Sequence, residues 1–331
     1  MMNHVTLPAL LGDSPLAILA AIGTLRLIHD FTDDNARLYW NTTDHRPVLT
    51  SSLATVDEVA EALVDIVRTM PEGVSVPGGP IGFPPPGEAP DKLRVPQGKL
   101  HSFAENLFPE ISGTESATMF SWLTSLITDL AATSEKNDSG SKNQKSNSQK
   151  RCSVSQFIAS SGKQSIATML KKPLEHVQKN PEYLHEALTD WVRVPGVTGE
   201  YLDHRAVWKA IDDSRGRTGR MRGVPGATWL ALMSYPLWTT TALRRRARTS
   251  GWHSVAVRRR SIQELRLPLW QEQPLGPAGV KALVEHPALD GDLGEPLNQE
   301  IRLLGVFHIC RARRHQSPGG KSAGILAPVS R

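Results

Sequence analysis

The sequence predicts an α+β fold of mixed helices and short antiparallel sheets, with a helical region in the second half of the chain. Three observations support this fold class. Apolar residues recur at helical spacing in several segments, short runs alternate or are rich in β-branched residues, and Pro, Gly and polar stretches separate them. With 331 residues, the chain is long enough for about two domains of roughly 150 residues each.

The chain opens with a predicted buried helix and a predicted strand pair. Ser14 and Pro15 suit the N-cap and the first position of a helix. The residues that follow, LAILAAIGTLRLI, are apolar nearly all round, so we expect this helix to be buried. Residues 36–40 (ARLYW) and 46–53 (RPVLTSSL) flank the segment NTTDH and predict two strands joined by a turn.

A second helix and a long loop come next. Thr55 and Glu58 have the spacing of a capping box, which predicts a helix that runs to Met70. Residues 71–100 hold eight prolines and six glycines and predict a long irregular loop. A loop of this length inside a domain is usually functional or disordered.

Another amphipathic helix precedes a strongly polar segment. Its predicted apolar stripe consists of Met119, Trp122, Leu123, Leu126, Ile127 and Leu130. Residues 133–150 then contain no apolar side chain, so burial cannot offset the entropy lost on ordering them. We expect a disordered polar linker or insertion over residues 133–151.

The second half begins with a predicted helical segment over residues 160–192. Within it, Asn180 and Pro181 suit the N-cap and the first position of a helix. Beyond it the sequence predicts a core segment at residues 227–238. It also predicts strands at residues 252–257, 264–270 and 301–309, and a short helix at residues 277–286. Pro268 weakens the strand pattern in which it lies.

The net charge of +5 conceals an asymmetry along the chain. Residues 1–132 hold 7 Lys and Arg against 16 Asp and Glu, and the rest of the chain holds 31 against 17. We therefore divide the chain into an acidic α+β part (1–132), the polar segment (133–151) and a basic, Arg-rich part (152–331). The basic part is expected to face a polyanion and the acidic part to face protein or solvent, unless both are simply solvated surfaces.

Arginine clusters are the main functional signal in the basic part. They comprise Arg215, Arg217, Arg220 and Arg222 in a Gly-rich loop over residues 195–226, then Arg244, Arg245, Arg246 and Arg248, then Arg258, Arg259 and Arg260, and finally Arg311, Arg313 and Arg314. The planar guanidinium makes bidentate contacts with phosphate and stacks on bases, so this enrichment favours nucleic-acid binding. Codon bias with surface salt bridges is the alternative interpretation.

The Gly-rich arm at residues 215–222 leads into the core segment 227–238. Gly223, Pro225 and Gly226 are expected to make the turn between them, so that the arm is tethered to a rigid base.

Two further sites are weaker candidates for nucleic-acid contact. The Pro/Gly loop carries Lys92, Arg94 and Lys99, and it could equally be a connector. Lys163 lies in SSGKQS, which resembles the end of a phosphate-binding loop but lacks its first Gly and its final Ser or Thr, so an exposed Lys at the start of a helix is the simpler interpretation.

No catalytic constellation emerges from the sequence, so we expect neither enzymatic activity nor a cofactor. Asp203, His204, Asp212 and Asp213 could hold a divalent metal, but pairing with nearby arginines is the simpler role for them. The chain has only two cysteines, outside any CxxC pair, no secretory signal pattern and no run of roughly 20 apolar residues. These observations favour a cytoplasmic protein without membrane contact.

Four patches resemble the large subunits of type I CRISPR surveillance (Cascade) complexes of subtype G, formerly U. The first is LPALLGDSPLAILAAIGTLRLI (7–28) with ARLYW (36–40), similar to a family opening of the form LxG…PLaxyLxALGvLRL and ARGxW. The others are SGKQSIATMLKK (161–172), RGVPGATWLALMSYPLW (222–238) and ELRLPLWQEQPLGPAGVKALV (264–284). The order of the patches fits the family, although the chain is short for a large subunit.

The resemblance implies a non-catalytic, antiviral role. Such subunits bind one end of the guide RNA assembly, read a protospacer-adjacent motif in the target duplex DNA, stabilise the guide–target R-loop and recruit a separate helicase-nuclease. The implied partners are guide RNA, double-stranded DNA, the backbone and guide-end subunits of the complex, and the helicase-nuclease. A stand-alone DNA- or RNA-binding protein and, less favoured, a metal-dependent nuclease remain the alternatives.

Overall fold

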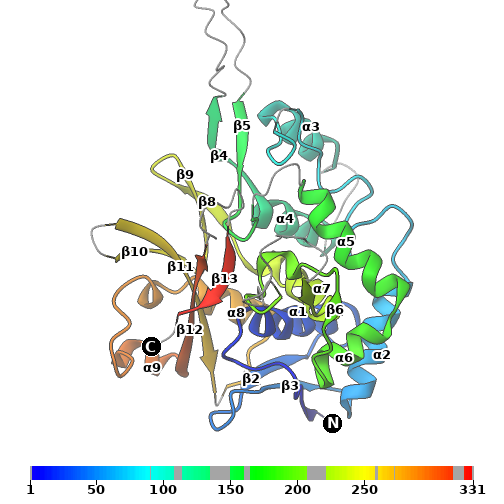
Figure 1. Cartoon of the computed structure of the whole chain (residues 1–331), viewed down its shortest axis with the longest axis vertical. Helices are drawn as coiled ribbons and strands as arrows, with labels where there is room; N and C mark the ends of the chain where they lie inside the picture. Colours follow the sequence, from blue (N-terminus) through cyan, green and yellow to red (C-terminus); the bar gives the residue numbers. More distant parts are fainter. Residues whose placement is uncertain are drawn as a thin grey trace, which may run out of the picture.

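The computed structural model of the chain describes residues 2–89, 91–107, 114–134, 150–159, 165–206, 221–257, 260–271, 273–315 and 324–329. It confirms the predicted α+β class, because helices pack together with several small antiparallel sheets (Figure 1). The α-helices are α1 Pro15–Phe31, α2 Val56–Arg68, α3 Gln97–Leu107, α4 Thr114–Leu126, α5 Ile166–Lys179, α6 Glu182–Thr189, α7 Pro225–Met233, α8 Pro277–Val284 and α9 Gln299–Leu303. Short 3₁₀ turns are η1 Gly199–Tyr201, η3 Tyr235–Leu237 and η4 Pro287–Leu289.

Within the described residues, the strands form one four-stranded sheet, one three-stranded sheet and three two-stranded ribbons, all antiparallel. The larger sheet has the order β10 Trp252–Val257, β11 Arg260–Trp270, β12 Val306–His315 and β13 Ile325–Pro328. The smaller one has the order β1 Asn3–Thr6, β3 Pro47–Ser51 and β2 Arg37–Trp40. The ribbons are β4 Ile127–Ser134 with β5 Lys150–Val154, β6 Val194–Pro195 with β7 Arg222–Gly223, and β8 Thr240–Leu243 with β9 Arg246–Thr249.

Two of the helix starts predicted from the sequence are confirmed. The third is shifted, because Pro181 is the N-cap of α6 and Asn180 is the C-cap of α5. α1 begins at Pro15 and is buried along most of its length. The backbone N–H of Glu58 donates to Thr55 Oγ1 at 3.2 Å, and Glu58 Oε2 accepts from the backbone N–H of Ala54 at 2.7 Å. The side chain of Glu58 therefore reaches one residue further back than in the usual capping box, and α2 ends two residues before Met70.

Two element boundaries differ from the prediction. The stripe that begins at Met119 does not continue as helix to Leu130, because the chain becomes strand β4 at Ile127 and pairs with β5. Leu130 is consequently 70% exposed. The segment 301–309 is not one strand, since α9 occupies its start and Gly305, with a φ of 77°, separates that helix from β12.

Pro268 lies inside β11, where a strand was predicted, and it does not interrupt the hydrogen bonds between neighbouring strands. The backbone N–H of Arg266 donates to Gly251 on the side of β10. The nitrogen of Pro268, two residues further along the strand, faces the same side. The pairing of β10 with β11 has already ended there, at Trp252 and Leu265. The missing N–H therefore removes no bond from the sheet.

The acidic and basic parts of the sequence share one hydrophobic core. Residues 135–149 of the polar segment lie outside the described residues, but its two ends pair with each other in the β4–β5 ribbon. An aromatic cluster joins distant segments of the basic part, since the ring of Phe157 lies 5.0, 5.2 and 5.6 Å from those of Tyr235, Trp238 and Trp252.

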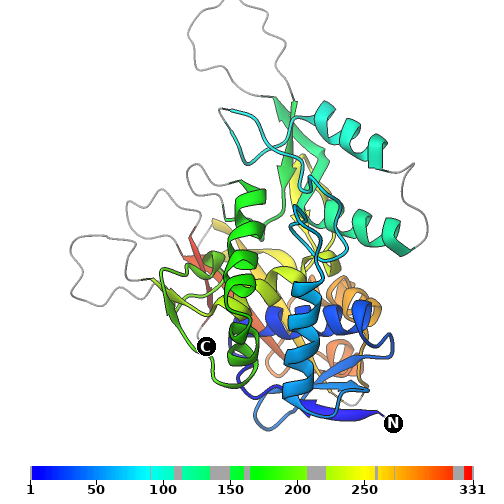
Figure 2. The same ribbon diagram turned by 90° about the vertical axis from the view of Figure 1, so that its right-hand side faces the viewer.

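Helix α7 lies at the centre of this core and is buried at every residue, which confirms the core assignment of the segment. Figures 1 and 2 show α7 beside α1, with α5 and α6 on its other side. Pro225 and Gly226 are the first residues of α7, so they do not form the expected turn. Gly226 is required by packing instead, because a Cβ there would lie 2.0 Å from the carbonyl oxygen of Tyr183 in α6.

The crossing of α1 and α7 depends on Gly23. A Cβ at this position would lie 1.8 Å from the carbonyl oxygen of Leu230. One turn further along α1, the buried Arg26 donates from Nη1 to the carbonyl oxygen of Met233 at 2.7 Å and satisfies the end of α7. Its Nε pairs with Asp30 at 3.1 Å, and its guanidinium lies 5.1 Å from the ring centre of Trp122.

The Gly23→Ala variant should lose about 3 kcal/mol of unfolding free energy, because overpacking a rigid backbone contact forces the two helices apart. Urea denaturation followed by circular dichroism measures this loss. Gly98→Ala is the matched control, since nothing lies within 4 Å of a Cβ at this exposed position of α3. The control should leave stability unchanged or raise it by about 0.5 kcal/mol. Equal stability of both variants would contradict the role of Gly23.

Candidate nucleic-acid interface

The β8–β9 hairpin presents one of the predicted arginine clusters at the surface. Arg244 and Arg245 form its tip with φ angles of 49° and 65°, as the two central residues of a type I′ turn do. Such turns favour Asn and Gly, and each larger residue in the left-handed region costs about 1 kcal/mol. Arg244, Arg245 and Arg246 are exposed, and none of them has an ion-pair partner among the described residues.

The base of this hairpin is held firmly by hydrogen bonds. Thr249 is fully buried, and its hydroxyl lies 3.0 Å from those of both Ser155 and Thr240. The backbone N–H of Thr249 donates to Gln156 Oε1 at 2.8 Å, and the Thr240 hydroxyl donates to the carbonyl oxygen of Ser125 at 2.6 Å. The cationic tip is therefore fixed relative to the core.

Arg248, predicted with the same cluster, is engaged within the protein. Its Nη2 lies 2.5 Å from Asp290 Oδ1, and the same carboxylate oxygen lies 3.0 Å from His253 Nδ1. Arg248 therefore ties the hairpin to the 3₁₀ turn η4. The exposed cations of the hairpin are the three at its far end.

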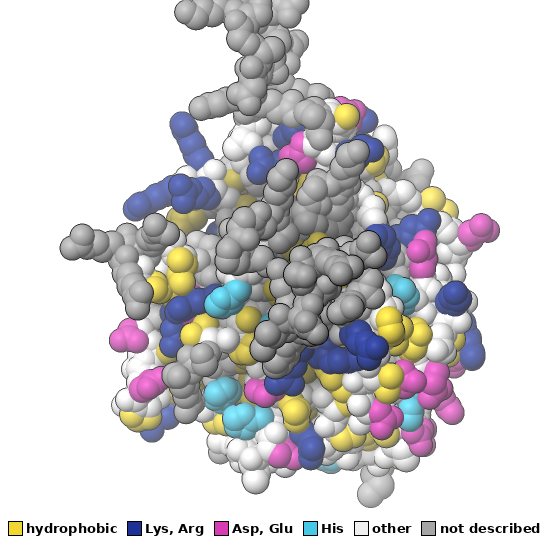
Figure 3. Space-filling model, viewed as in Figure 1, with side chains coloured by type: hydrophobic (Ala, Val, Ile, Leu, Met, Phe, Trp, Pro, Cys, Tyr) yellow, Lys and Arg dark blue, Asp and Glu magenta, His cyan; other side chains and the backbone are white. Residues whose placement is uncertain are grey.

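Two other hairpins project on the same side of the molecule. In Figure 1, β4–β5, β8–β9 and β10–β11 extend from the upper left of the core. Of the third predicted cluster, Arg258 and Arg259 lie outside the described residues, and Arg260 opens β11 opposite Val257. Figure 3 shows Lys and Arg side chains over the β8–β9 region, whereas Asp and Glu gather at the lower right. The described tip of the β8–β9 hairpin is thus the candidate interface.

The described part of the Gly-rich arm is short. Arg215, Arg217 and Arg220 lie outside the described residues. Arg222 is exposed in β7, where its N–H donates to Ala206 at 2.9 Å and its carbonyl accepts from Arg193 at 2.8 Å. The end of the arm is thereby anchored beside α7, and contact of its arginines with nucleic acid remains a prediction.

A buried arginine, predicted as the last residue of the polar segment, holds one part of the Pro/Gly loop. Arg151, on β5, donates from Nη1 to the carbonyl oxygens of Glu88, Asp91 and Arg94 at 3.0, 3.3 and 3.1 Å, and from Nη2 to that of Ala89 at 3.2 Å. The guanidinium fork has enough donors for this arrangement, and a lysine does not. Residues 88–94 are therefore fastened to β5.

The three cations predicted on that loop differ in their surroundings. Lys99 forms an ion pair with Glu88, and Arg94 lies 3.6 Å from Asp91. Lys92 is exposed and has no ion-pair partner among the described residues. Exposed pairs contribute about 0–1 kcal/mol and exchange readily for phosphate, so all three stay candidates. Lys163 lies outside the described residues.

The fourth arginine cluster is engaged largely within the protein, although the side chain of Arg311 remains 39% exposed. Glu264 is completely buried and accepts from Arg311 Nε at 3.0 Å and from Arg313 Nε at 2.8 Å. Burial disfavours the ionised carboxylate, but hydrogen bonds from these arginines outweigh it and lower the pKa of Glu264. Arg266 Nε also lies 3.3 Å from the same carboxylate.

Arg314, the remaining member of that cluster, is held by backbone carbonyls. It donates to those of Gln156, Phe157 and Gly324 at 3.1, 2.8 and 3.1 Å, and it lies 5.6 Å from the ring centre of Trp252. Burial lowers the pKa of Arg314 to about 10. These contacts connect β12 with the segment before α5.

Of the four candidate metal ligands, the structure describes Asp203 and His204. Asp203 is buried and accepts from Arg193 Nη1 at 2.6 Å, in line with the expected arginine pairing. Burial lowers the pKa of His204, and Asp212 and Asp213 lie outside the described residues. The described part of the chain contains no group of three His, Cys, Asp or Glu residues placed to hold a metal ion.

Comparisons with protein-family models and with curated proteins give no match. Among the described residues, no helix combines the length and apolar character that crossing a membrane requires.

The Glu264→Gln variant should lose about 3–5 kcal/mol of unfolding free energy, because it leaves Arg266 and two further arginines around a neutral group. Chemical denaturation measures the loss. Glu61→Gln, at an exposed position of α2, should change stability by less than about 0.5 kcal/mol. A surface role for the cluster would instead leave the Glu264→Gln protein as stable as wild type.

His253 should make the fold sensitive to mild acid. Its side chain is 6% exposed, and burial together with Arg266 lowers its pKa to about 4, although Asp290 acts in the opposite direction. Between pH 6.5 and 4 the unfolded chain therefore binds the proton that the folded chain rejects, so stability falls as pH falls. Unfolding curves at pH 7, 6, 5 and 4 should show a shallower decline for His253→Asn than for wild type. Parallel declines would contradict this assignment.

Proposed function

We propose that the chain is a non-catalytic nucleic-acid-binding subunit of a type I CRISPR RNA-guided surveillance complex. In this role it recognises the protospacer-adjacent motif of target duplex DNA, stabilises the guide–target R-loop and helps to recruit the helicase-nuclease in antiviral defence. The observation that supports it best is the β8–β9 tip, whose three exposed arginines have no partner among the described residues and stand on a hydrogen-bonded base.

The resemblance of the four sequence patches supplies the specific part of this proposal. Two of those patches contain α1 and α7, whose crossing organises the core. The tip arginines supply the general part, since guanidinium groups bind phosphates through paired hydrogen bonds. Base pairing with the guide RNA would recognise the target sequence. The protein would recognise the shape of the nucleic acid and the short protospacer-adjacent motif.

The deciding experiment is a tagged purification from the native host, followed by sequencing and sizing of the RNA that copurifies. Short RNAs of uniform length with a common repeat-derived end, together with the other subunits of the complex, are the expected result. Heterogeneous RNA, or none, would overturn the surveillance-complex assignment and favour a stand-alone nucleic-acid-binding protein.

Removing the tip cations without disturbing the turn should weaken duplex binding. The variant carries Arg244→Asn, Arg245→Gly and Arg246→Thr, which keeps the preferred residues of a type I′ turn and a good strand former. The slope of log K against log salt should become shallower by about 0.9 for each phosphate that the variant no longer neutralises. Fluorescence anisotropy with a labelled duplex over a salt series measures both quantities.

The control removes the same charge from scattered exposed sites on α2, α5 and α9. It carries Arg68→Ala, Lys171→Ala and Arg302→Ala. If the control and the tip variant bind the duplex equally weakly, the effect is one of net charge and the hairpin has no specific role. If the tip variant binds as wild type does, the hairpin does not contact the duplex.

A further inference from the structure

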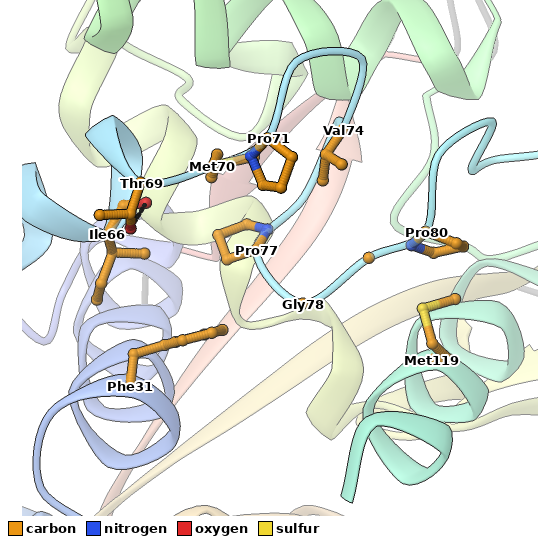
Figure 4. A pocket seen from close by; sticks show the side chains of 11 residues that line it. Phe31, Ile66, Thr69, Met70, Pro71, Val74, Pro77, Gly78, Pro80 and Met119 are labelled. Carbon is orange, nitrogen blue, oxygen red and sulfur yellow. Dashed lines mark hydrogen bonds between the residues drawn. The ribbon is translucent and has the colours of Figure 1, made fainter. Parts of the chain in front are cut away.

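The acidic part of the chain contains an apolar cavity of ≈ 340 Å³ that opens to solvent (Figure 4). It lies where the ends of α1 and α2 meet the Pro/Gly loop, with α4 on the far side. Its apolar lining includes Phe31, Ile66, Met70, Val74, Pro77 and Met119. Its volume equals that of about ten water molecules, which is enough for one large side chain.

The walls of this cavity are built into the fold. Val76 and Phe83 are buried, so they anchor the loop on both sides of the cavity rim. Gly78 has a φ of 68°, and a Cβ on Gly79 would lie 2.9 Å from the carbonyl oxygen of Val76. Phe31 nevertheless remains 44% exposed at the end of a helix that is otherwise largely buried. The cavity is therefore preformed, and its apolar surface is open.

An acidic groove of ≈ 690 Å³ adjoins the cavity along α2. Asp57, Glu61 and Asp65 recur every four residues on α2 and face the start of α6, where Glu182 lies. His185 stands between the acids, with Nε2 2.8 Å from Asp57 and Nδ1 3.4 Å from Glu182. Figure 2 looks onto α2 with α6 beside it, and Figure 3 shows Asp and Glu gathered over this region.

Adjoining residues of α2 line the two hollows. Asp65 and Arg68 belong to the groove, whereas Ile66 and Thr69 belong to the cavity. The hydroxyl of Thr69 donates to the carbonyl oxygen of Asp65 at 2.8 Å, so the two linings meet within one helical turn. From Asp57 to Thr69 the surface spans about 18 Å, the length of a three-turn helix.

We propose that this surface, the α2 face, docks an amphipathic basic helix of a partner protein. A bulky apolar residue of that helix fills the cavity beside Phe31, and its Lys or Arg side chains lie along the groove. Charge complementarity selects this occupant. The groove carries carboxylates at three successive turns of α2 and a fourth on α6, against one arginine, Arg68, which lies 3.8 Å from Asp65. The acidic part also carries a surplus of negative charge. Apolar anchoring with a charged rim is the usual helix-in-groove arrangement.

The α2 face is separate from the candidate nucleic-acid interface. The arginine-rich hairpin lies at the upper left of Figure 3 and the acidic region at the lower right. Carboxylates repel a phosphate backbone, so a nucleic acid is a poor occupant for the groove. The proposal does not rest on the function proposed above, since it requires only a protein partner.

A panel of fluorescein-labelled helical peptides of about three turns tests the proposal by fluorescence anisotropy. The parent peptide carries two Leu one turn apart among Lys and Ala, one control replaces both Leu by Ala, and another replaces Lys by Glu. The parent should bind, and each control peptide should bind at least tenfold more weakly. No detectable binding of the parent, or equal binding of the Leu-free peptide, would overturn the proposal.

Protein variants locate the binding. Glu61→Lys with Asp65→Lys, and separately Phe31→Ser, should each weaken parent binding at least tenfold, while duplex affinity of the Phe31→Ser protein stays at the wild-type value. Glu105→Lys with Glu300→Lys makes the same charge change at exposed sites elsewhere and should leave peptide binding unchanged. Circular dichroism checks that each variant is folded.

Two results with these folded variants would overturn the proposal. One is wild-type peptide affinity in both α2-face variants, which would place the peptide elsewhere. The other is that wild type elutes as a dimer in size-exclusion chromatography and these variants elute as monomers. The α2 face would then be an interface between copies of this chain. Neither result bears on duplex binding, so failure here is distinct from failure of the nucleic-acid assignment.

Discussion

The close crossing of α1 and α7 is the constraint on which the rest of the structure depends. Because residue 23 has no side chain, the backbone of α7 approaches α1 at Leu230, and Arg26 then satisfies the end of α7. Helix α7 in turn carries α5 and α6 on its other side, and Gly226 allows an equally close approach to α6. The missing side chain at Gly23 thus brings segments about 200 residues apart together, and the one at Gly226 joins α7 to the nearer helix α6.

Arginine occupies two opposite environments in this chain, one buried among backbone carbonyls and one exposed at a hairpin tip. Arg26, Arg151 and Arg314 each donate to backbone carbonyls that secondary structure leaves free, and they join elements far apart in sequence. Their desolvation is offset because the guanidinium supplies several donors in a fixed plane. The tip arginines Arg244 and Arg245 make no such contacts among the described residues, and their left-handed backbone is conformationally costly. The number of arginines in a sequence segment does not reveal which of them are buried against backbone carbonyls and which are exposed.

Much of the fold could be predicted from local patterns, and most of the site could not. The capping box at Thr55 and the buried segment of α7 were readable, because short-range bonding and uninterrupted apolar residues determine them. The end of α4 was not, since the change to strand at Ile127 depends on pairing with β5 beyond a long polar segment. Likewise, Glu264 neutralises arginines about 47 residues away along the chain, a pairing that only the register of β11 with β12 creates.

The two proposed surfaces are joined by a single core, which has a mechanical consequence. The β8–β9 base is bonded to Ser125 and Ser155, and α4, which ends next to Ser125, also lines the cavity through Met119. Close-packed interiors transmit displacement rather than absorb it. A nucleic acid at the hairpin tip and a helix on the α2 face would therefore be held at a fixed separation. Under both proposals, the chain would present a bound duplex to a second protein in one orientation.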